Sequence, residues 1–115
     1  MRRLPIIAIT LGDAGGIGPE IILKASREKE LLEICRPLVI GDWGVLEETA
    51  RRLDWPFELE RLSGVFPESW PRGKMAVLDL ANLDFRKIPM GKPSSITGKA
   101  AVEYIFKAVE LILAG

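Results

Sequence analysis

The chain has 115 residues, of which 48% are hydrophobic and 28% are charged, a composition typical of one small globular unit with a single core. Its 16 basic and 16 acidic residues cancel, so the strong positive charge expected of a nucleic-acid-binding protein is absent. The apolar runs are too short to span a bilayer and the start of the chain lacks the pattern of a signal peptide, so we expect a soluble, cytoplasmic protein with neither nucleic acid nor membrane as partner.

The first predicted element is a strand at residues 5–10, a continuous apolar run of the kind buried on both faces of a parallel sheet. A glycine-rich loop at residues 12–20 leads into a helix predicted at 19–32, whose polar stretch at 26–30 is expected to break it early. Four glycines in seven positions permit positive φ and let a ligand approach the backbone, and Pro19 suits the first helical turn.

The opening of this helix is the first candidate binding site. Unpaired N–H groups and the positive end of the helix dipole favour a phosphate, a carboxylate or the polar edge of a cofactor. A tight turn without a ligand explains the glycines equally well, because the spacing is neither the dinucleotide fingerprint nor a phosphate-binding loop that ends in Gly-Lys-Ser/Thr.

Further buried strands are predicted at residues 37–41 and 76–80, and a half-exposed edge strand is predicted at 57–62, where apolar and charged residues alternate. The helix predicted at 43–53 has one apolar face and one charged face, and Pro56 ends it. The apolar face consists of Val45, Leu46, Thr49, Ala50 and Leu53, and the charged face carries the i,i+4 pairs Glu47 with Arg51 and Glu48 with Arg52.

The last predicted helix, at residues 97–114, has an apolar stripe opposite a charged one, and its N-cap is Ser94, Ser95 or Thr97. The apolar stripe consists of Ala101, Tyr104, Ile105, Ala108, Val109 and Ile112, and the charged one of Lys99, Glu103, Lys107 and Glu110. Strands and helices in this order predict an α/β fold, a mostly parallel sheet with helices on both faces.

In such a sheet, ligands bind beyond the carboxyl ends of the strands. The loop at 11–18, Asp42 and the region after Leu80 would therefore converge on one side of the sheet. Asp13 and Asp42 could each accept hydrogen bonds from a ligand, or each could cap a helix. The segment 81–95 also offers polar groups there, namely Asn82, Asp84, Lys92, Ser94 and Ser95, although an ordinary surface loop is the simpler interpretation.

The sequence GDAGGIGPE at residues 12–20 resembles the GDPAGIGPE signature of the PdxA family, the 4-hydroxythreonine-4-phosphate dehydrogenases of vitamin B6 biosynthesis, with Ala14 and Gly15 in place of Pro-Ala. It is also similar to the GDGIGPE opening of isocitrate and isopropylmalate dehydrogenases. The resemblance continues at residues 37–42 and 98–105. It implies that residues 1–115 are a single α/β unit, the N-terminal fragment of a larger two-domain dehydrogenase with an isopropylmalate dehydrogenase-like fold.

The resemblance also implies a function for the full-length enzyme, a homodimer that uses NAD and a divalent metal (Zn, Mg or Co). The reaction is oxidation of 4-phosphooxy-L-threonine to a β-keto acid, which decarboxylates to 3-amino-2-oxopropyl phosphate on the route to pyridoxal 5'-phosphate. Family members bind the metal through three histidines, and this chain has none, so neither the metal site nor a catalytic residue is assigned to it. The residues assigned to cofactor binding are Gly12, Asp13, Gly16, Ile17 and Gly18.

Two alternatives remain open at this level. One is a dehydrogenase of threonate or erythronate 4-phosphate, because relatives of the family oxidise such acids. The other is a free-standing, non-catalytic module that binds a phosphorylated metabolite or a partner protein. The isolated chain is expected to be inactive in either case, since it lacks a metal site and a histidine to stabilise an alkoxide.

Overall fold

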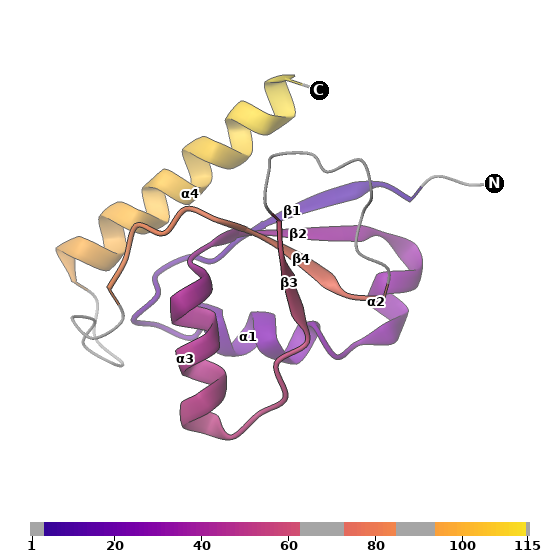
Figure 1. Ribbon diagram of the computed structural model, residues 1–115. Coiled ribbons are helices and arrows are strands. Elements are labelled where there is room, and N and C mark those ends of the chain that lie inside the picture. The colour runs from indigo at the N-terminus through magenta and orange to yellow at the C-terminus, as the bar shows by residue number, and fades with distance from the viewer. Residues whose placement is uncertain (1–3, 63–72, 85–93, 115) are drawn as a thin grey trace.

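The computed structural model of the chain describes residues 4–62, 73–84 and 94–114 (Figure 1). Strands and helices follow one another in the order β1 (Ile6–Thr10), α1 (Gly18–Ala25), α2 (Lys29–Ile34), β2 (Arg36–Gly41), α3 (Trp43–Leu53), β3 (Leu59–Arg61), β4 (Met75–Asp79) and α4 (Ser95–Ala114). Most of the loop predicted at 81–95, including Lys92, lies outside the described residues.

The four strands form one parallel sheet in the order β1-β2-β4-β3. The central strands β2 and β4 are almost entirely buried, as their continuous apolar runs predict. The prediction that the first strand is buried on both faces is wrong for β1, because its Ile6 and Ile7 are 37% and 47% exposed. The reason is its position, since β1 lies at the end of the sheet and pairs with β2 alone. The edge strand predicted at 57–62 is confirmed as the shorter β3, which pairs only with β4.

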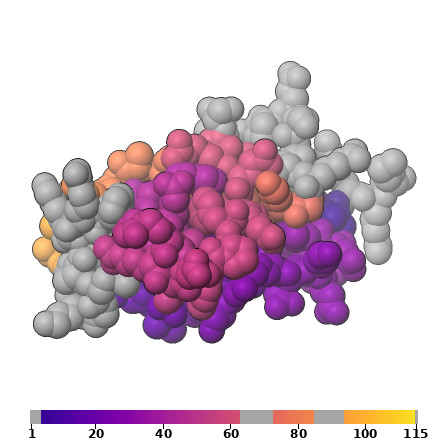
Figure 2. All heavy atoms as spheres, turned by 60° about the horizontal axis from the view of Figure 1, so that its bottom comes forward, coloured from indigo at the N-terminus to yellow at the C-terminus, as the bar shows by residue number. Residues whose placement is uncertain are grey.

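Helices cover both faces of the sheet, which confirms the predicted α/β class. In Figure 1, α1, α2 and α3 lie on one side and α4 on the other, where it contacts β1 and β2. Figure 2 shows the first side in space-filling form, with α3 and the segment after it beside α1 and α2. The core between the layers is aliphatic apart from the buried ring of Tyr104, and its fully buried members include Leu23, Leu38, Ile40 and Leu46. The identification of this unit as an N-terminal fragment stays a prediction.

The first predicted helix is broken in the polar stretch, as expected. Ser26 ends α1, its hydroxyl donating to the carbonyl of Leu23 at 2.6 Å, a local bond that competes with continuation of the helix. Glu28 is then extended, and α2 begins at Lys29.

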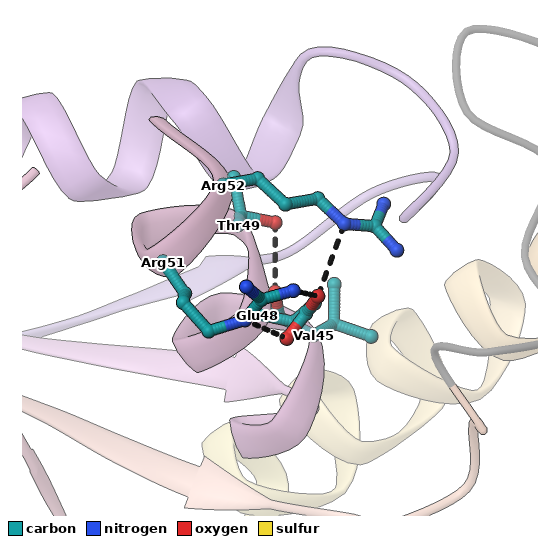
Figure 3. A network of polar contacts seen from close by, with 5 residues as sticks. All are labelled: Val45, Glu48, Thr49, Arg51 and Arg52. Atoms are coloured by element: carbon teal, nitrogen blue, oxygen red, sulfur yellow. Dashed lines mark hydrogen bonds and ion pairs between the residues drawn. The ribbon is translucent and has the colours of Figure 1, made fainter. Parts of the chain in front are cut away.

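Helix α3 has most of the apolar face that its periodicity predicts, since Val45, Leu46, Thr49 and Ala50 are buried. The fifth predicted member, Leu53, is 37% exposed because it is the last residue of the helix. Its charged face differs in part (Figure 3): Glu48 accepts hydrogen bonds from both Arg51 and Arg52, the latter at 3.1 Å. The predicted pair of Glu48 with Arg52 is therefore confirmed, whereas that of Glu47 with Arg51 is wrong because the closer Glu48 takes the guanidinium of Arg51. The hydrogen bond from Arg51 lowers the pKa of Glu48.

Helix α4 packs on the sheet through a stripe that overlaps the predicted one only at Tyr104 and Ala108. Its buried residues are Thr97, Ala100, Tyr104 and Ala108, whereas the predicted stripe members Ile105, Val109 and Ile112 are 47–70% exposed. Periodicity was misleading because α4 is apolar on two sides, so that sequence alone does not identify which side meets the sheet. Although α4 has 20 residues, no helix in the described ranges is long and apolar enough to cross a membrane.

Candidate functional site

The glycine loop connects the carboxyl end of β1 to α1 through a hydrogen-bonded turn. Leu11 extends the strand pairing by one bond, its N–H donating to the carbonyl of Ile40 at 3.0 Å, and Gly12 then turns the chain with φ of +74°. A carboxylate oxygen of Asp13 accepts from the N–H of Gly15 at 2.8 Å, and the Asp13 carbonyl accepts from Gly16 at 3.0 Å. One oxygen of Asp13 is thus used to shape the loop.

Close backbone packing explains one of the loop glycines. A Cβ added to Gly18 would lie 2.1 Å from the carbonyl oxygen of Leu11, so only glycine lets α1 begin against the end of β1. Gly41, at the end of β2, lies against the Leu11 side chain and would place a Cβ 2.8 Å from that residue's Cβ. The loop therefore rests on the carboxyl ends of both strands, which is the convergence that the topology predicts.

The start of α1 is open. Ile17 is its N-cap and makes no side-chain capping bond, and Pro19 and Glu20 occupy the first turn. Gly16 and Ile17 are exposed, the latter by 70%. Backbone N–H groups of the first helical turn lack intrahelical partners and attract anions. The five residues assigned to cofactor binding from sequence thus surround this opening, although their role in binding stays a prediction.

Asp42, the second carboxylate that sequence places near a ligand, has a structural role. It is 3% exposed and caps α3, with one oxygen accepting from the N–H of Val45 at 3.0 Å. Its other oxygen accepts from the N–H of Leu83 at 3.1 Å. Both oxygens are engaged, so of the two alternatives the capping one is confirmed.

Asp79 is a second structural carboxylate at the same edge, and the sequence analysis missed it. One of its oxygens accepts from the N–H groups of Trp43 and Ala81, at 3.0 and 2.9 Å. The sequence feature that could have identified Asp79 is an acidic residue at the end of an apolar strand, where side-chain oxygens commonly accept hydrogen bonds from the backbone of the following turn.

A buried tyrosine ties α4 to the strand ends. The hydroxyl of Tyr104 donates to the side-chain carbonyl of Asn82 at 3.1 Å, and the amide nitrogen of Asn82 donates to Glu103 at 2.7 Å. Burial, followed by the negative charges of Asp42, Asp79 and Glu103, raises the pKa of Tyr104 far above its ordinary value. Tyr104 is therefore a protonated hydrogen-bond donor and has a structural role.

The N-cap of α4 is Ser94, one of the three predicted candidates. Its hydroxyl accepts from the N–H of Thr97 at 3.2 Å, and the hydroxyl of Thr97 accepts from the N–H of Ser94 at 3.3 Å. This reciprocal pair gives α4 the side-chain cap that the start of α1 lacks. Among residues 4–62, 73–84 and 94–114, no group of three or more Cys, Asp or Glu could hold a metal ion.

The chain is similar over nearly its whole length to known dehydrogenases, although no family model matches it. It is 37% identical over 107 residues to a Fusobacterium nucleatum protein, covering 93% of this chain and 32% of that protein. A Clostridium botulinum protein is 36% identical over 115 residues, which is 100% of this chain and 34% of that protein. Both carry the provisional name D-threonate 4-phosphate dehydrogenase.

A solved structure supports the same relationship. The 4-hydroxythreonine-4-phosphate dehydrogenase from Burkholderia phymatum matches with a TM-score of 0.87 and 35% identity, over 99% of this chain and 34% of that one. The chain thus spans about a third of the length of the relatives it matches. In fold and sequence it is homologous to one third of dehydrogenases that are named for phosphorylated hydroxy acids.

Proposed function

We propose that this chain supplies the cofactor side of the active site in an NAD-dependent dehydrogenase of phosphorylated four-carbon hydroxy acids. The observation that supports this most is similarity to such dehydrogenases over 93–100% of the chain. The geometry agrees, because an open helix start at the carboxyl ends of parallel strands is where α/β proteins bind such ligands.

Each loop residue has a defined part in this proposal. The backbone N–H groups of Ile17 and Gly18 would face the cofactor's diphosphate, with the positive end of α1 behind them, while Gly16, whose N–H donates to the Asp13 carbonyl, would keep the loop in shape beside it. The oxygen of Asp13 that does not bond Gly15 would accept a hydrogen bond from a ribose hydroxyl. When bound, NAD would supply the hydride acceptor for the alcohol carbon, and this chain would contribute binding and orientation.

The divalent metal that the family implies does not fit the described residues. The chain has no histidine, and the described part contains no acidic or cysteine cluster that could replace one. Asp42 and Asp79, the carboxylates nearest the strand ends, are occupied by backbone N–H groups. We therefore derive no catalytic step through a metal from this chain, and homodimer formation stays part of the proposal.

The first candidate substrate is 4-phosphooxy-L-threonine. Loss of hydride to NAD and of a proton from the C3 hydroxyl gives the β-keto acid, which then releases carbon dioxide to leave 3-amino-2-oxopropyl phosphate. The second candidate is D-threonate 4-phosphate, favoured by the name of the Fusobacterium and Clostridium relatives. The two substrates differ in the group on C2, an ammonium in the first and a hydroxyl in the second.

The test uses a chimera in which this chain replaces the matching third of the Clostridium botulinum relative. NADH formation is measured with each substrate, with the unaltered relative as the reference. Ile17→Glu places a negative charge at the start of α1, and Ile34→Glu is a matched control on α2, because the two isoleucines are 70% and 68% exposed.

We expect Ile17→Glu to raise the KM for NAD at least tenfold, about the effect of one repulsive charge near the diphosphate, whereas Ile34→Glu leaves it unchanged. A folded chimera that forms no NADH with either substrate, while the reference is active, would refute the proposed function. Equal KM values for NAD in the two variants would show that the cofactor does not bind at the glycine loop.

A further inference from the structure

Helix α4 carries a second apolar stripe that faces away from the sheet. Its buried side consists of Thr97, Ala100, Tyr104 and Ala108. The outward stripe recurs every three or four residues, and its members are 47–82% exposed: Val102, Ile105, Phe106, Val109, Ile112 and Leu113. The charged residues of the helix lie on a third side. A helix that is apolar on two sides is typical of one buried between two layers of structure.

The strand next to α4 adds exposed apolar side chains at the edge of the sheet. Helix α4 contacts β1, whose Ile6 and Ile7 are exposed and whose outer edge has no partner in the described sheet. Six of the thirteen exposed large hydrophobic side chains in the described residues belong to the outward stripe of α4, and two more, Ile6 and Ile7, lie on the edge strand, one on each face of the sheet. Such a concentration marks an interaction surface, because scattered single residues would need no explanation.

The relatives supply the argument for what covers this surface. Each is about three times as long as the region that matches this chain, so each relative contains two further thirds of polypeptide that can cover an apolar surface of that region. On the opposite face of the sheet, α1, α2 and α3 already cover the strands (Figure 1).

We propose that the outward stripe of α4, with the neighbouring edge of β1, is the surface that binds the polypeptide corresponding to the other two thirds of these dehydrogenases. The inference rests on the proposed function in one respect, since both take the rest of the protein from the same relatives. The inference differs from the proposed function because the interface does not involve NAD or substrate.

The experiment compares the 115-residue chain with the chimera described above, each carrying Ile105→Glu or Ile21→Glu. Ile21 is a matched control, because both isoleucines lie on helices and are 54% exposed, Ile105 on α4 and Ile21 on α1. Thermal midpoints are measured without NAD or substrate, so that a failure of the interface is distinguished from a failure of catalysis.

We expect Ile105→Glu to lower the midpoint of the chimera by at least about 5 °C, because a charge would be buried there. In the chain alone it should lower the midpoint by less than about 2 °C, and Ile21→Glu should act alike in both proteins. An equal effect of Ile105→Glu in both proteins would overturn the proposal.

Two measurements on the chain alone keep the test decisive if the chimera does not fold. Binding of a hydrophobic dye should fall with Ile105→Glu and not with Ile21→Glu, and the opposite result would show that the stripe is not an open surface. In analytical ultracentrifugation, a dimer that is lost in Ile105→Glu would assign the surface to a second copy and overturn the proposal.

Discussion

Replacing Gly18 with alanine tests the packing that shapes the candidate site. The new Cβ would lie 2.1 Å from the carbonyl oxygen of Leu11, whereas ordinary contacts begin near 3.4 Å, so α1 or the end of β1 must move by roughly 1 Å. Overpacking of this kind costs about 1–3 kcal/mol, and the loss of glycine's freedom in the unfolded chain returns about 0.4–1 kcal/mol. We expect Gly18→Ala to destabilise the chain by about 1–2 kcal/mol, or roughly 4–8 °C in midpoint.

The control is Gly16→Ala in the same loop. Its Cβ would meet only the carbonyl oxygen of Asp13, at 3.4 Å, and Gly16 has no positive φ, so its effect should stay within about 0.5 kcal/mol. Thermal unfolding is followed by circular dichroism and by the fluorescence of Trp43 and Trp55, which both pack against the core. Equal midpoints for the two variants would refute the argument that α1 begins in contact with Leu11.

Three further predictions concern the strand ends and the isolated chain. The purified 115-residue chain should form no NADH with either substrate, and a turnover that a chelator abolishes would contradict this. Asp42→Asn keeps the shape but replaces one acceptor oxygen with an NH2 donor, so one of the two bonds from Val45 and Leu83 is lost; urea unfolding should show a loss of about 1–2 kcal/mol, and an unchanged midpoint would count against the capping role. Tyr104 is the only tyrosine, and its raised pKa means that its stabilising contribution is complete below the unfolded value near pH 10 and is lost at higher pH. Phenolate absorbance should therefore appear only as the chain unfolds in alkali; a titration near pH 10 in the folded chain would contradict the buried bond to Asn82.

Sequence identified the central strands, the glycine loop and α3 because each depends on local information. Continuous apolar runs identify β2 and β4, and glycine spacing identifies a loop whose conformation rests on Gly12 and Gly18. The side of α4 that meets the sheet depended instead on packing between distant segments. Ile105 and Ala108 look equivalent in a periodic pattern, and only the sheet distinguishes them.

The candidate site was predicted less completely than the fold. Asp13 and Asp42 were equivalent in sequence, both being acidic residues after a strand. The cap that Asp42 forms with Val45 is local, but its second oxygen is occupied because Leu83, 41 positions later, donates to it, and no local pattern records that contact. Asp79 has a local donor in Ala81, but its bond to Trp43, which lies 36 positions earlier, could not be read from the sequence.

The strand order also constrains how the sheet can assemble during synthesis. Strand β3 precedes β4 in the chain, yet it touches the sheet only through β4, which lies between β2 and β3. A nascent chain that has emerged only as far as residue 74 can pair β1 with β2, but β3 has nowhere to add and one edge of β2 stays unpaired. Such edges recruit other chains. The emergence of Met75–Asp79 is thus the step that pairs this edge of β2 and gives β3 its place in the sheet.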